Sequence, residues 1–66
     1  MLKYEAEKEG DNLTAVIRDS STGGIEMTVR MESPRIGDVI VHIGHYDSEM
    51  AAKTELIELF PDMKWR

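Results

Sequence analysis

The chain has 66 residues, no cysteine, and 13 acidic against eight basic side chains, for a formal net charge of -5. This length predicts a single domain, residues 1–66, with a small core. The missing cysteines exclude disulfides and thiolate metal sites. The acidic balance disfavours binding to nucleic acid or to an anionic membrane surface. No stretch resembles a signal peptide or the ~20 apolar residues of a membrane span, so we expect a cytoplasmic protein.

Two strands are predicted at the start of the chain, over residues 2–9 and 13–19, because apolar and polar side chains alternate there. Gly10 and Asp11 suit a two-residue hairpin turn between them. Alternation assigns one face of both strands to the core. The residues expected on that face are Leu2, Tyr4, Ala6, Leu13, Ala15 and Ile17.

A third strand is predicted over residues 24–32, where apolar and polar residues alternate without exception from Ile25 to Glu32. A loop of residues 21–23 leads into it. A turn around Pro34 leads to a fourth strand over residues 38–44, because proline fixes φ and lacks a backbone donor. The expected inward residues of this fourth strand are Val39, Val41 and Ile43.

The period changes after His45, and residues 48–60 predict a helix. Asp47 or Ser48 is the expected N-cap, and Pro61 ends the helix. Its expected apolar stripe consists of Ala52, Leu56, Leu59 and Phe60, widened by Met50 and Ile57. The predicted fold class is α+β: a four-stranded antiparallel meander (ββββα) with one C-terminal helix packed on its apolar face.

The sheet face away from the helix is the predicted binding surface. The expected register places Glu5, Val16, Thr28 and His42 in one row, and Glu7, Thr14, Arg30 and Ile40 in the next. Val16 and Ile40 are apolar where a polar residue is expected, and arginine is enriched at interface anchors. The predicted partner-binding residues are Val16, Arg18, Thr28, Arg30, Ile40 and His42.

An alternative surface is the acidic edge of the first strand, where a carboxylate stands at every second position: Glu5, Glu7, Glu9 and Asp11. Carboxylates spaced at ~6.7 Å along a strand can imitate a phosphate backbone. Charged edge strands also prevent unwanted strand pairing, which explains the same residues without a partner.

We expect no catalytic residue, no cofactor and no metal site. His42 and His45 are three residues apart, which on a strand places them on opposite faces. The serines, histidines and aspartates lack a G-x-S-x-G elbow, and so small a core leaves little room for a pocket. The sequence therefore favours a binding protein over an enzyme.

The function expected from these features is that of a small, acidic, non-catalytic protein that binds another protein, a basic one by net charge. By analogy of size and charge alone, small inhibitors of host proteins such as defence nucleases, encoded by phage and mobile elements, share this profile. One alternative is a homo-oligomer that binds a small anionic ligand or nucleotide at loop 21–24, with Arg18, Arg30 or Arg35 as donors. Another is a small structural subunit of a larger assembly.

Overall fold

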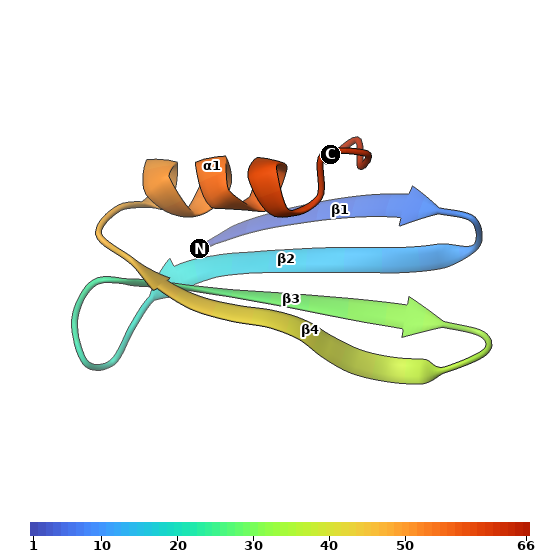
Figure 1. Cartoon of the computed structure of the whole chain (residues 1–66). Coiled ribbons are helices and arrows are strands. Elements are labelled where there is room, and N and C mark those ends of the chain that lie inside the picture. Colours follow the sequence, from blue (N-terminus) through green and yellow to red (C-terminus); the bar gives the residue numbers. More distant parts are fainter.

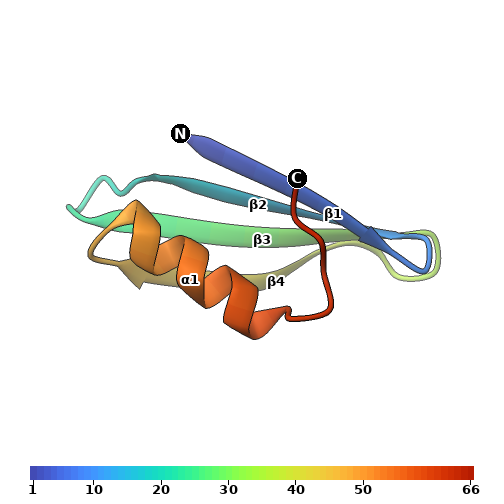
Figure 2. The same cartoon turned by 90° about the horizontal axis from the view of Figure 1, so that it is seen from above.

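The computed structural model describes all 66 residues and consists of one antiparallel sheet and one helix. The elements are β1 (Leu2–Lys8), β2 (Asp11–Asp19), β3 (Ile25–Ser33), β4 (Gly37–Tyr46) and α1 (Glu49–Leu59). The strands keep chain order in the sheet, β1-β2-β3-β4 (Figure 1). The helix forms a second layer on one face, as the view from above shows (Figure 2). The predicted α+β meander with a C-terminal helix is confirmed.

The core lies between the sheet and α1. Strand β3 supplies Met27 and Val29, both fully buried, while Glu26 and Arg30 point to the other face, as the alternation predicted. Strand β2 adds Ile17, and the helix adds Leu56. The complete set of buried apolar residues is Ala6, Leu13, Ala15, Ile17, Met27, Val29, Ala52 and Leu56.

The first hairpin turns one residue earlier than predicted. Glu9 and Gly10 occupy the turn, with positive φ angles of 53° and 86°, and Lys8 pairs with Asp11. Two positive φ angles define a type I′ turn, whose twist matches that of antiparallel strands. Glutamate is an uncommon residue in this conformation, and the prediction from the sequence therefore placed the turn one residue too late. Glu5 consequently lies opposite Thr14 and not opposite Val16.

The second hairpin has the predicted register. Arg18 pairs with Glu26, and Val16 pairs with Thr28. The connecting loop is closed by hydrogen bonds from the Ser20 amide to the Gly24 carbonyl (3.0 Å) and from the Gly23 amide to the Ser20 carbonyl (3.1 Å). The loop therefore satisfies some of its own backbone hydrogen-bonding groups without a ligand.

A β-bulge interrupts the pairing of β3 with β4. Arg30 pairs with Ile40, but Val29 pairs with His42, so that Val41 has no partner of its own. One extra residue reverses the faces of all the residues that follow it. The prediction that Val41 and Ile43 point into the core is therefore wrong. Their side chains are 41% and 57% exposed.

The helix begins at the predicted cap, where the Ser48 Oγ accepts a hydrogen bond from the Ala51 amide at 3.1 Å. It ends before Pro61, as expected. Its buried stripe is narrower than predicted and consists of Ala52 and Leu56 alone. The remaining stripe residues are partly buried or exposed: Met50, Ile57, Leu59 and Phe60.

The tail after α1 crosses to the outer edge of β1 (Figure 2). The Arg66 amide donates to the Glu5 carbonyl (2.8 Å), and the Glu5 amide donates to the Arg66 carbonyl (3.0 Å). Trp65 packs edge-on against Phe60, with ring centroids 6.0 Å apart. The tail therefore occupies part of one sheet edge. The helix is too short and too polar to cross a membrane.

Candidate functional site

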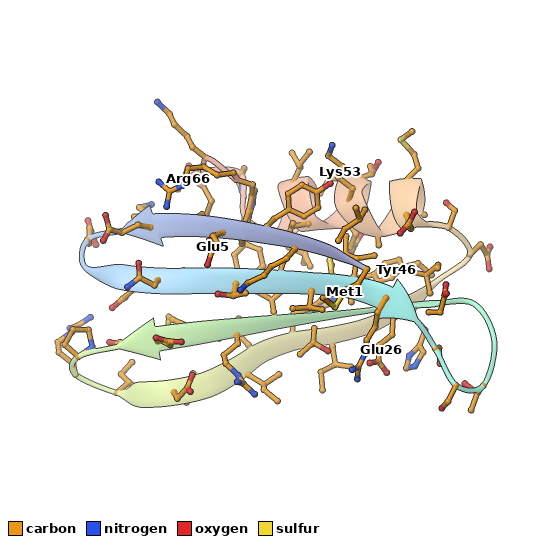
Figure 3. All side chains as sticks on the ribbon, turned by 180° about the vertical axis from the view of Figure 1, so that it is seen from behind. Met1, Glu5, Glu26, Tyr46, Lys53 and Arg66 are labelled. Atoms are coloured by element: carbon orange, nitrogen blue, oxygen red, sulfur yellow. The ribbon has the colours of Figure 1, made fainter.

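The sheet face that α1 does not cover, called the open face from here on, contains the predicted binding residues that the structure brings together. Figure 3 views the sheet from this side, with α1 behind it. Val16 and Thr28 are paired across β2 and β3 at its centre. On the same face, Arg18 is the next residue along β2 after Val16, and Arg30 is the next residue along β3 after Thr28. All four line one open hollow of about 480 Å³, together with Met1, Lys3, Thr14 and Glu32.

Ile40 also lies on the open face, beside Arg30, with which it pairs across β3 and β4. Its side chain is 52% exposed. Ile40 lies on the edge strand, β4, and does not line the hollow. The sequence thus placed five of its six candidate residues on the correct face: Val16, Arg18, Thr28, Arg30 and Ile40.

His42 is the exception, and its predicted place on the open face is wrong. The bulge at Val41 turns it to the helix side, where it pairs with the buried Val29. Its Nε2 lies 2.8 Å from the Tyr46 hydroxyl, within hydrogen-bond distance. Burial, and then the negative charge of Glu55, raise the pKa of Tyr46. His42 therefore belongs to a polar contact under the helix and not to the candidate site.

Sequence reasoning missed two residues of the open face and misplaced a third, Lys3, within that face. Ile43 lies opposite Thr28, and His45 lies opposite Glu26, because the bulge exchanges the two faces of β4. Lys3 lies opposite Val16, because the first hairpin turns at Glu9. The signal that could have revealed Ile43 was the run from Val39 to Val41, three consecutive apolar residues that break a strict alternation.

The hollow is locally cationic, although the chain as a whole is acidic. Lys3, Arg18 and Arg30 line it, and Glu32 is the only acidic side chain that does. The Arg18 Nη2 lies 3.1 Å from a Glu26 carboxylate oxygen, and the Arg30 Nε lies 3.9 Å from one of Asp38. Exposed ion pairs of this kind contribute little to stability, so an incoming anion can replace them at low cost.

The four carboxylates of the alternative acidic surface do not lie together in the structure. Glu5 and Glu7 lie on the open face of β1, whereas Glu9 is in the type I′ turn. Asp11 pairs with Lys8, on the helix side of the sheet. The earlier turn interrupts the strand after Lys8, so the four carboxylates do not form the single row that mimicry of a phosphate backbone requires.

The two histidines lie on opposite faces of β4, and no group of three or more His, Asp or Glu side chains is placed to hold a metal ion. Arg35, a predicted phosphate donor, belongs to the turn between β3 and β4, and its amide donates to the Ser33 Oγ at 3.3 Å. It is separated from Arg18 by the length of the sheet, because Arg18 lies near the other end of its strand. The two arginines therefore do not converge on one ligand.

Comparison with protein-family models, curated proteins and solved structures gives no match to this chain. The chemistry of the open face is thus the basis for assigning a function.

Proposed function

We propose that this chain is a non-catalytic binding protein and that the open face contacts its partner. The observation that carries the proposal is the hollow around Val16 and Thr28, in which three cationic side chains meet two short, half-buried ones. A hollow of about 480 Å³ that is open along one side suits a protruding segment of another protein.

The local charge argues for an acidic segment on the partner. Net charge alone favoured a basic partner, but the residues that would be covered are Lys3, Arg18 and Arg30. Complementary charge speeds encounter and selects the partner, while an apolar contact at the centre supplies affinity. A loop or strand that carries carboxylates around one apolar side chain therefore fits this face best. A cytoplasmic location accords with the lack of cysteine.

Val16→Glu tests this proposal. The substitution places a charge at the centre of the hollow, on a side chain that points away from the core, so the fold should persist. Thr54→Glu is the matched control, because it adds the same charge on an exposed position of α1. The parent protein is used to capture a partner from an extract of the source cells, and the partner is then purified.

Isothermal titration of the purified partner should give equal affinities for the parent and Thr54→Glu. The affinity of Val16→Glu should fall at least 100-fold, because the new carboxylate would pair with Lys3, Arg18 and Arg30 in place of the partner's carboxylates and would set a charge against the partner's apolar side chain. Raising the salt concentration should weaken binding of the parent, because three cations take part. Equal affinity for Val16→Glu would refute the open face as the binding surface.

A small anionic ligand is the second candidate, favoured by the same three cations. Titration of inorganic pyrophosphate into labelled protein is the direct measurement. Saturable shifts of the Arg18, Thr28 and Arg30 amides, lost in an Arg30→Gln variant, would support this candidate. Absence of shifts at millimolar concentration would dismiss it and leave the protein partner.

A further inference from the structure

The outer edge of β4 has no partner within the chain. The sheet order leaves two edges, β1 and β4, and the tail occupies part of the β1 edge through Arg66. No residue of β4 takes part in any of the seven backbone hydrogen bonds that lie outside the helix and the strand ladders. Its outward amides and carbonyls are therefore available to another strand.

The β4 edge is also apolar. Ile40, Val41 and Ile43 are 52%, 41% and 57% exposed. The strand contains no lysine, arginine or proline, which are the residues that commonly keep an edge strand from pairing. The protective features present are the bulge and one exposed carboxylate, Asp38, and whether they protect depends on the strand that approaches.

We infer that the partner of this edge is a second copy of the chain, paired antiparallel through β4 about a two-fold axis between Val41 and His42. A strand with regular alternation would have to skip a residue at the bulge, as β3 does at Val29 and Arg30. A second β4 carries the same bulge at the axis. The two copies then remain in phase on both sides of it, so the open face of one continues into that of the other.

Complementary side chains fix the register. With the axis between Val41 and His42, Asp38 of one copy lies opposite His45 of the other, and Ile40 lies opposite Ile43. Asp38 is already 3.9 Å from Arg30, and His45 is 3.7 Å from Glu26. The Asp38 carboxylate can therefore accept a hydrogen bond from the His45 ring across the interface, and each isoleucine covers another. Val39 falls opposite Gly44, a large residue against a small one.

This pairing is separate from the proposed partner site. It uses the edge of the sheet, while Val16 and its neighbours lie on β2 and β3. Pairing would join the sheets of the two copies and place both hollows on the same side of the joined sheet. Val16→Glu should therefore leave the mass of the assembly unchanged, whatever it does to partner binding.

Sedimentation velocity over a range of concentrations measures the mass of the unmodified chain. We expect a reversible change from 7.5 kDa to twice that mass as the concentration rises. Hydrogen exchange of the β4 amides should slow over the same range. A mass that stays at 7.5 kDa up to about 1 mM, the weakest dissociation constant that would matter, would overturn the inference.

Two single substitutions test the register. Ile40→Glu and Ile43→Lys should each give a monomer, because each sets two charges against isoleucines of the second copy. Mixed in equal amounts, the two variants should form a heterodimer, since one Glu then meets one Lys and one Ile–Ile contact remains. Ile57→Lys is the control: its side chain is 53% exposed, close to that of Ile40, but lies on α1.

Circular dichroism of each variant shows whether it folds. A dimeric Ile57→Lys together with rescue by mixing supports this register. An unmodified chain that dimerises while Ile40→Glu and Ile43→Lys remain dimeric would show that a different surface is used. Two monomeric variants that fail to associate on mixing would overturn the register, because this register brings the introduced Glu and Lys into contact in the mixed dimer.

Discussion

Gly44 holds a position where an added Cβ would collide with the Tyr46 ring, which folds back over it. A Cβ built on Gly44 would lie 2.8 Å from Cε2 and Cζ of that ring. Gly44 is absent from the residues with positive φ, so its backbone accepts alanine and the obstacle is steric alone. Gly44→Ala must therefore push the tyrosine outward and break its 2.8 Å contact with His42.

The expected cost can be worked out from three contributions. Crowding a packed site costs about 1–3 kcal/mol, and losing the hydrogen bond costs about 0.5–1.5 kcal/mol. Alanine returns about 0.5–1 kcal/mol because it restricts the unfolded chain more than glycine does. Since Tyr46 is only partly buried and can turn toward water, we take the lower ends. The free energy of unfolding should then fall by about 0.5–1 kcal/mol, which lowers the Tm by roughly 4–8 °C per kcal/mol.

Urea denaturation followed by the fluorescence of Trp65, the single tryptophan, measures this change. The same substitution in a Tyr46→Ala background is the decisive comparison. With the ring removed, Gly44→Ala should raise the free energy of unfolding by about 0.5–1 kcal/mol, since only the effect on the unfolded chain remains. An effect of the same sign in both backgrounds would refute the steric explanation.

Three further predictions concern the turn, the core and the pH dependence. Glu9→Asn should raise the free energy of unfolding by about 1 kcal/mol, because asparagine tolerates the positive φ of the type I′ turn, and thermal unfolding measures it. Leu56→Ala should cost about 2–5 kcal/mol in urea denaturation, since this side chain is 1% exposed; an unchanged midpoint would contradict the packing of α1. Burial and Glu55 raise the pKa of Tyr46, so the folded protein keeps the phenol proton longer than the unfolded chain. Stability should thus be complete below about pH 10 and fall as the pH rises above it. Glu55→Gln should lower this pKa in an absorbance titration, made in a Tyr4→Phe background so that one phenol is observed.

Strand β3 shows what periodicity alone can predict. Its strict alternation set Met27 and Val29 inside and Glu26 and Arg30 outside, and each of these positions is confirmed. The assignment of side chains to the two faces is reliable in β3 because a register slip of one residue would bury its charged side chains. The register of β2 against β3 followed from the loop length in the same way.

Strand β4 shows where the same reasoning stops. Val39, Ile40 and Val41 are all apolar, so either phase of alternation buries at least one of them, and the run shows that alternation breaks without showing which residue is the extra one. The bulge lies in the middle of β4, and pairing with β3 continues beyond it to Tyr46, so its position depends on how the whole strand fits against β3. The placement of His42, Ile43 and His45 depended on that bulge, and with it a part of the candidate site.

The tail contacts were also beyond local reasoning. The bond between Arg66 and Glu5 joins the two ends of the chain, and no pattern in either segment indicates the other. Trp65 folds back because a large aromatic ring gains by leaving water. The partner that it found, Phe60, followed from the position at which the helix ends.

The order of the elements has a consequence for synthesis on the ribosome. Each strand pairs with its neighbour in sequence, so the three hairpins can form one after another as the chain emerges. The helix that covers their apolar face is made last. The buried residues of β2 and β3 are therefore exposed to water until α1 arrives. During that interval, a nascent sheet with an unpaired β4 edge is the species most exposed to aggregation and to chaperones.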